Sequence, residues 1–167
     1  MKKSARPKIE IPLEETDRLL DGLVVASLAI MFVIPALHYA ELPEVIPIHF
    51  NLKGEADGYA PKAFLWLLPT ISSFTCGLML FLARYPHTFN YPVKITEQNA
   101  EAHYRLAARM MRALNAVIAV FFAYLCRELV QMGLQERSTL KPWAVPLLIV
   151  GIVGVLVWYF RGMRRIG

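Results

Sequence analysis

The chain alternates between long apolar runs and short polar segments. Four runs are almost free of charged residues, at about residues 19–39, 63–83, 107–125 and 143–160. Each is close to the roughly 20 residues that a helix needs to cross the hydrocarbon core of a bilayer. The pattern therefore predicts an all-α integral membrane protein, with four transmembrane helices in a single polytopic domain over residues 1–167.

Composition supports the same class of protein. Hydrophobic residues make up 56% of the chain and the mean hydropathy is +0.43, whereas soluble domains are about 45–50% apolar. The net charge is +5, but most Lys and Arg flank the apolar runs, which is typical of membrane proteins and argues against nucleic acid as a partner. Cys76 and Cys126 lie inside apolar runs and are expected to stay unpaired.

The basic residues are distributed unevenly between the two sets of connecting segments. The richer set comprises the N-terminal segment, residues 84–112 and the segment after the fourth run. It contains 13 of the 18 basic residues: Lys2, Lys3, Arg6, Lys8, Arg18, Arg84, Lys94, Arg105, Arg109, Arg112, Arg161, Arg164 and Arg165. The other set contains Lys53, Lys62, Arg127, Arg137 and Lys141. By the positive-inside rule, both termini and the loop 84–106 are expected in the cytoplasm, and the loop 40–62 outside.

The segment at residues 40–62 is polar and contains several Pro and Gly residues. Pro43 and Pro47 favour extended backbone, and apolar residues at alternate positions from Ile46 to Phe50 are typical of a half-buried strand. Two Gly-containing turn signals follow. The pattern predicts a short, ordered, hairpin-like cap on the outer membrane surface.

This loop also carries a recognisable spacing. Its residues follow the form Leu-Pro-x-x-Ile-Pro-x-His-Phe-Asn-x-x-Gly-x-x-Asp with a Lys a few positions on. The matching positions are Leu42, Pro43, Ile46, Pro47, His49, Phe50, Asn51, Gly54, Asp57 and Lys62. The spacing resembles that of a bacterial membrane-protein family of unknown biochemical function, typified by the SdpI-type immunity proteins.

The resemblance implies a membrane protein of the bacterial inner membrane without an established catalytic residue. The typifying immunity protein, which has additional spans, protects its producer from a secreted toxin and holds a transcriptional repressor at the membrane. The function expected here is therefore non-enzymatic: sensing, immunity-type protection or accessory binding through the outer loop. Besides the lipid bilayer, the expected partner is a secreted peptide, a regulator or a membrane complex. The alternatives are an accessory subunit of a larger complex and a small-solute transporter.

The loop also contains residue types that bind metals. His49 and Asp57, with nearby carboxylates, could ligate zinc, but the chain has no HExxH motif and no close pair of histidines on this side. We expect His49 and Asp57 to hydrogen-bond to each other or to loop backbone, and we expect no metal and no cofactor.

A second candidate site lies on the cytoplasmic side. Thr96 has the character of an N-cap, and the amphipathic stretch that follows runs into the third apolar run. It carries a basic face formed by Arg105, Arg109 and Arg112. These arginines are expected either to touch anionic lipid head groups or to form a docking face for a cytoplasmic partner.

Overall fold

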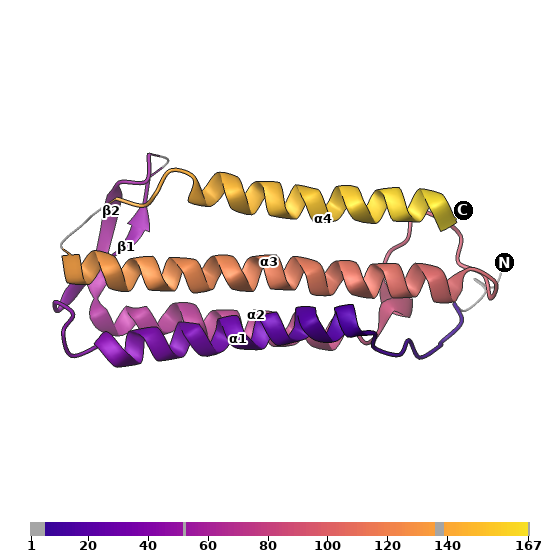
Figure 1. Ribbon diagram of the computed structural model, residues 1–167, viewed down its shortest axis with the longest axis horizontal. Coiled ribbons are helices and arrows are strands. Elements are labelled where there is room, and N and C mark those ends of the chain that lie inside the picture. The colour runs from indigo at the N-terminus through magenta and orange to yellow at the C-terminus, as the bar shows by residue number, and fades with distance from the viewer. Residues whose placement is uncertain (1–5, 52, 136–138, 167) are drawn as a thin grey trace.

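The computed structural model describes residues 6–51, 53–135 and 139–166, so Lys2, Lys3 and Arg137 of the charge distribution lie outside the described residues. Helices dominate the structure, with one small sheet (Figure 1). The elements are α1 (Glu15–His38), β1 (Val45–Phe50), β2 (Ala56–Pro61), the 3-10 helix η1 (Lys62–Trp66), α2 (Leu67–Leu82), the 3-10 turn η2 (Pro86–Thr88), α3 (Ala100–Gln135) and α4 (Ala144–Ile166).

The helices form an elongated bundle in which α3 is central. Figure 1 shows α3 between α4 on one side and the pair of α1 and α2 on the other. The two strands lie at one end of the bundle, which we call the hairpin end. Both termini lie at the opposite end, which we call the terminal end. Because α1 and α3 both run from the terminal end to the hairpin end, they are parallel neighbours.

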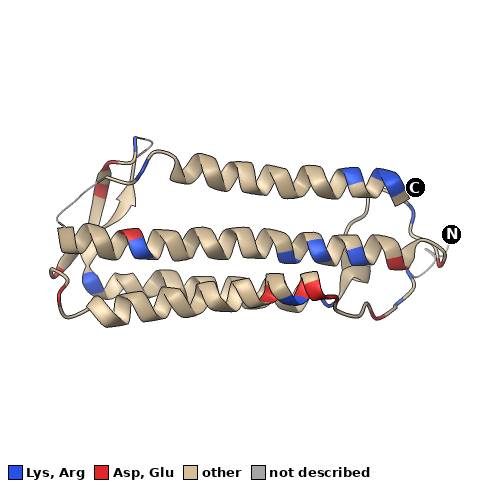
Figure 2. Ribbon diagram, viewed as in Figure 1, with Lys and Arg blue, Asp and Glu red and all other residues tan. Residues whose placement is uncertain are grey.

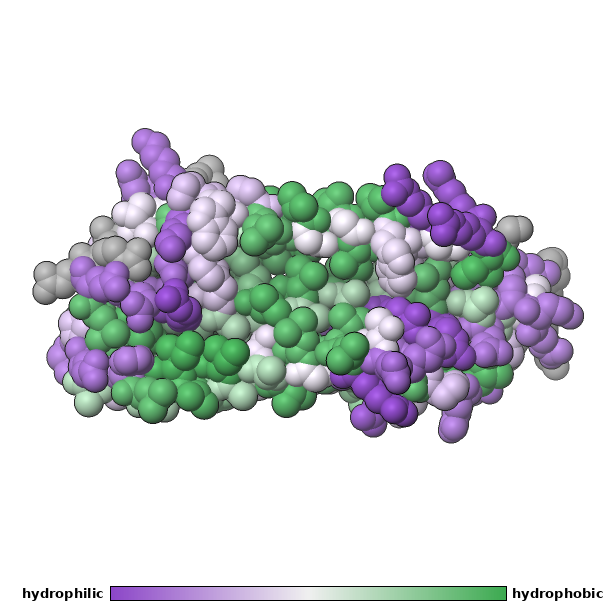
Figure 3. All heavy atoms as spheres, in the orientation of Figure 1, coloured by the Kyte–Doolittle hydropathy of each residue, from purple (hydrophilic) through white to green (hydrophobic). Residues whose placement is uncertain are grey.

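All four long helical segments are long and apolar enough to cross a membrane: Glu15–His38, Lys62–Leu82, Ala100–Gln135 and Ala144–Ile166. Figure 3 shows the corresponding surface, an apolar band across the middle of the bundle with hydrophilic residues gathered at both ends. Exposed Leu, Val and Phe side chains on the outer helix faces are what a lipid environment accommodates. The predicted four-helix architecture, with a short ordered segment between the first two helices, is confirmed.

The third helix differs from its predicted length. We expected a span over residues 107–125 with an amphipathic stretch running into it. The helix α3 does run without interruption through both, from Ala100, but it continues to Gln135, so that it has 36 residues or about 54 Å. This exceeds the roughly 30 Å hydrocarbon core. The helix continues past the charged pair Arg127 and Glu128 because its last turns pack under the hairpin, where Val130 is fully buried.

Small and polar residues let the helices approach one another. Ala116 and Ala119 of α3 pack against Val24 of α1 and Cys76 of α2. The fully buried Asn115 donates from its side-chain nitrogen to the backbone oxygen of Cys76 at 3.1 Å, so it links α3 to α2. As expected for polar residues within spans, it faces the neighbouring helices.

The start of α3 also differs from the expectation. Thr96 is not the N-cap, because the helix begins at Ala100 and residues 97–99 form a turn. The Asn99 side chain closes this turn: its oxygen accepts from the Thr96 backbone N–H at 2.8 Å, and its nitrogen donates to the Lys94 carbonyl at 3.1 Å.

Candidate functional site

The loop 40–62 folds into an antiparallel hairpin whose turn is closed by Asn51. Its side-chain oxygen accepts from the backbone N–H groups of Lys53 at 2.8 Å and Glu55 at 3.1 Å, and its side-chain nitrogen donates to the Glu55 carboxylate at 2.9 Å. The backbone carbonyl of Asn51 also accepts from Gly54 N–H at 2.9 Å. One short polar side chain thus accepts hydrogen bonds from two backbone N–H groups of the turn. This is why Asn is favoured at such positions.

Two glycines are required by close approaches in this hairpin. Gly54 has a φ of +81°, and a Cβ there would lie 3.0 Å from the backbone oxygen of Leu140 in the α3–α4 connection. Gly54 O in turn accepts from Leu140 N–H at 2.8 Å. At Gly58, a Cβ would lie 2.8 Å from the Cβ of His49 on the opposite strand. Both positions therefore favour glycine for geometric reasons.

His49 and Asp57 form the cross-strand contact that the sequence predicted. The Nδ1 atom of His49 lies 2.5 Å from Oδ1 of Asp57. The two side chains are 73% and 45% exposed, so the contact stands in solvent at the surface of the hairpin. Among the described residues no group of three or more His, Cys, Asp or Glu side chains is placed to hold a metal ion.

The hairpin is attached to the bundle through its inner face and its base. Ile46 is fully buried and clusters with Leu42, Leu65 of η1 and Val130 of α3. Lys62, at the far end of the hairpin, folds back over its start: its Nζ lies 3.3 Å from the backbone oxygen of Leu42.

The same ammonium group contacts two further residues. It lies 3.0 Å from the Glu44 carboxylate and 5.2 Å from the centre of the Tyr39 ring. Lys62 is therefore a clasp between the two ends of the hairpin, which explains its place in the sequence pattern without a catalytic role.

The outward face of the hairpin is apolar and exposed. Val45 pairs with Pro61 and Pro47 with Tyr59, and paired residues share one face of an antiparallel sheet. On this face Pro47 is buried, and the other three residues are exposed. Val45 is 55% exposed and Tyr59 is 58% exposed, whereas their neighbours Ile46 and Ala60 face the core. The exposed apolar side chains of the hairpin, Val45 and Tyr59, are therefore not among the residues that define the motif.

The expected alternation from Ile46 to Phe50 is only partly right. Ile46 is buried, but Ile48 is 42% exposed and Phe50 is half-buried. The strand register shifts between Pro47 and His49 and again between His49 and Phe50, which rotates the side chains out of a strict two-residue period. Of the motif prolines, Pro47 is buried within the strand and Pro43 is exposed beside α3.

The second candidate is the basic face of α3, and its surroundings differ from those expected. Arg105, Arg109 and Arg112 do not form an open basic surface, because acidic residues at the start of α1 pair with them (Figure 2). We call this set the arginine–carboxylate ladder. It consists of Glu14, Asp17, Asp21, Glu101, Arg105, Arg109 and Arg112.

The ion pairs of the ladder occur in the same order along α1 and α3, because the two helices are parallel. Arg105 contacts Glu14 and also Glu101 at 3.0 Å, and Arg109 contacts Glu14 at 2.6 Å. Arg109 also reaches Asp17 at 2.9 Å. Hydrogen bonding to the Arg109 guanidinium lowers the pKa of the Glu14 carboxyl.

The pair nearest the middle of the bundle contains the most buried arginine of the ladder. Arg112, whose side chain is 6% exposed, lies 3.1 Å from the Asp21 carboxylate. A signal for the ladder is present in the sequence: the spacing of Glu14, Asp17 and Asp21 closely matches that of the three arginines. This match in spacing can be recognised as a set of ion pairs only once α1 and α3 are known to be parallel neighbours.

Both cysteines are buried free thiols, in agreement with the expectation that they stay unpaired. Cys76 lies in α2 and Cys126 in α3, where its thiol donates to the Met31 carbonyl at 3.4 Å.

Comparisons with known proteins cover part of the chain. Residues 26–72, which include most of α1, the hairpin and the start of α2, match the family of a domain of unknown function, DUF1648. An uncharacterized protein of Archaeoglobus fulgidus is 32% identical over 89 residues, which cover 48% of this chain and 49% of that protein. The chain thus spans about half the length of this curated relative. No solved structure matches. The family match therefore connects the hairpin region to a domain whose function is unknown, and the resemblance to the SdpI-type family is not confirmed.

Proposed function

We propose that the protein is a non-enzymatic, multi-pass membrane protein that binds a protein or peptide partner through the outward face of its hairpin. The observation that carries this proposal is the exposed apolar face formed by Val45, Tyr59 and Pro61. Aromatic and aliphatic side chains that the fold does not use are typical of the centre of a protein interface.

The rigidity of the hairpin favours recognition. The Asn51 turn, the His49–Asp57 contact and the Lys62 clasp fix the strands before any partner arrives. A preformed surface loses little conformational entropy on binding, so more of the contact energy is available as affinity.

The distribution of Lys and Arg supports an orientation with both termini in the cytoplasm, within the cytoplasmic membrane of the cell. In that orientation the hairpin faces outward. A partner that reaches it is a secreted peptide or the outer part of another membrane protein, which is the setting of sensing, of immunity-type protection and of accessory binding.

The test is site-specific photo-crosslinking in the native host cells. A photoreactive amino acid at Tyr59 is expected to give a discrete protein or peptide adduct. The same amino acid at Lys141, which is exposed in the α3–α4 connection of the hairpin end, is expected to give none. A secreted peptide as the adduct supports the sensing or immunity form, and a stoichiometric membrane protein supports the accessory-subunit form. Equal adducts at both positions, or lipid adducts alone, would contradict the proposal.

A further inference from the structure

A groove lined by residues of α1, α3 and α4 runs along the bundle. Among the helices, α4 packs chiefly against α3 and reaches it closely at Gly151, where a Cβ would lie 3.0 Å from Val117. On the α1 side, Leu20 and Leu23 form the opposite wall. The groove has a volume of about 710 Å³, within the range of about 300–1,000 Å³ typical of ligand sites.

The lining of this groove is almost entirely apolar. Its floor is one face of α3 from Ala113 to Tyr124, and its second wall is formed by Trp143 and by α4 as far as Val155. At about 1.5 Å per residue, that wall is about 18 Å long, which suits an extended acyl chain better than a compact solute. At the hairpin end the groove is bounded by the rings of Tyr124 and Trp143, 5.1 Å apart.

The last turns of α4, which lie beyond the groove at the terminal end, carry positive charge. Arg161, Arg164 and Arg165 of α4 are exposed, and in the part of the chain that the structure describes none of them forms an ion pair. In Figure 2 the basic end of α4 stands apart from the acidic residues of α1, which lie against α3. This end of α4 attracts anions.

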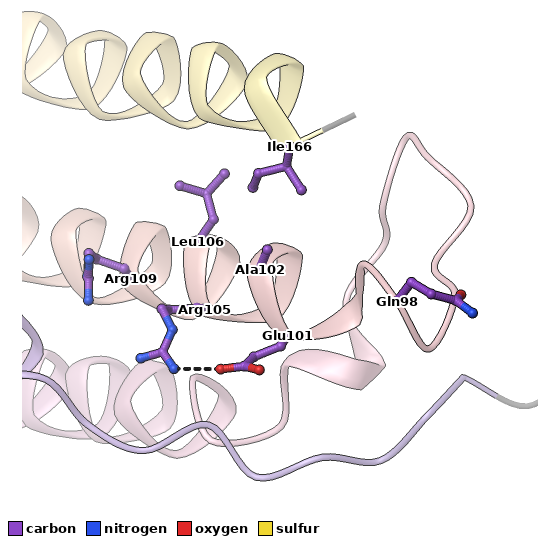
Figure 4. A pocket seen from close by; sticks show the side chains of 7 residues that line it. All are labelled: Gln98, Glu101, Ala102, Arg105, Leu106, Arg109 and Ile166. Carbon is purple, nitrogen blue, oxygen red and sulfur yellow. Dashed lines mark hydrogen bonds and ion pairs between the residues drawn. The ribbon is translucent and has the colours of Figure 1, made fainter.

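The neighbouring arginines of α3 are already occupied. Figure 4 shows the hollow between the ends of α3 and α4, where Arg105 is paired with Glu101 and Arg109 lies on the α1 side. Leu106 and Ile166 lie between the two helices in this hollow, beyond Val155, where the apolar lining of the groove ends. An anionic head group at this level would therefore meet the arginines of α4.

From this arrangement we propose that the groove between α1, α3 and α4 binds one acyl chain of an anionic phospholipid, whose phosphate lies at Arg161, Arg164 and Arg165. The lipid belongs to the leaflet at the terminal end. The inference concerns a surface far from the hairpin and does not rest on the proposed partner.

The first test measures lipid retention by native mass spectrometry of the purified, full-length protein in detergent. With equal amounts of phosphatidylglycerol and phosphatidylcholine added, the wild type is expected to retain phosphatidylglycerol preferentially. Replacing Arg161, Arg164 and Arg165 together with Gln is expected to lower that preference at least about fivefold, because arginines near a membrane surface attract anionic lipids. The matched control replaces Arg18, Arg84 and Lys94, three basic residues of the same end, with Gln and is expected to keep it.

The second test fills the groove. Ala113→Phe places a ring on its floor and is expected to displace the retained lipid, whereas Ala29→Phe, on an exposed face of α1 that does not line the groove, is expected to leave retention unchanged. Thermal unfolding of each variant checks that it is folded. Equal loss in the control triple variant, unchanged retention in Ala113→Phe, or loss of a dimer rather than of lipid in Ala113→Phe would overturn the proposal.

Discussion

At the scale of single residues, the positions that make the hairpin recognisable are those that set its geometry. Asn51 closes the turn, Gly54 takes a left-handed conformation beside Leu140, and Gly58 lets the strands approach at His49. Side chains exposed to a partner, such as Tyr59, are free of these constraints. The motif therefore marks where the surface is built, and the recognition specificity that we propose lies in residues beside it.

Gly58 provides the sharpest test of this distinction. In Gly58→Ala the new Cβ would lie 2.8 Å from the Cβ of His49, and both atoms are tied to backbone, so the strands must shift. We expect a loss of about 1–3 kcal/mol of stability, as for other overpacked sites. The measurement is thermal unfolding in detergent, together with limited proteolysis of the hairpin.

A second glycine serves as the control for that experiment. Gly77 lies in α2, and a Cβ added there would have no atom within 4 Å, so Gly77→Ala is expected to be neutral or to stabilise by about 0.5–1 kcal/mol. Equal unfolding temperatures for the two variants would show that the contact between Gly58 and His49 does not constrain the hairpin.

At the scale of elements, the four helices and the hairpin were predictable, but the contacts between them were not. Apolar runs of about 20 residues identify spans, and Pro, Asn and Gly identify the turn. Sequence could not show that α3 continues to Gln135, because the burial that stabilises its last turns comes from the hairpin. Nor could it show that the arginines of α3 face acids some 90 positions earlier, since that depends on which helices are neighbours.

The pair of Asp21 and Arg112 tests the ladder. Asp21→Arg and Arg112→Asp are each expected to lower the unfolding temperature, because each places like charges together next to a buried position. Breaking a fully buried ion pair costs about 3–5 kcal/mol, and less is expected here because Asp21 is 28% exposed. The double variant restores opposite charges and should recover part of the loss. Additive effects of the two substitutions would mean that the pair is not coupled.

At the scale of the whole molecule, the two ends of the bundle differ in charge and in construction. The terminal end combines the paired ladder with arginines of α4 that form no ion pair with any described residue, and the hairpin end presents exposed apolar side chains among polar ones. Positively charged residues resist translocation whether or not they later form ion pairs, so the pairing within the ladder does not weaken the argument for orientation. The proposed partner and the head group of the proposed lipid would then bind on opposite sides of the membrane.

This orientation can be measured directly in intact cells. A single new cysteine is introduced at Lys53, in the turn of the hairpin, or at Glu97, in the loop before α3, and the cells are treated with a membrane-impermeant maleimide. The native thiols of Cys76 and Cys126 are buried and should react little, and the unmodified chain measures their background. Lys53→Cys is expected to be labelled in intact cells and Glu97→Cys only after lysis. The reverse pattern would place the hairpin in the cytoplasm, and a secreted peptide could then not be its partner.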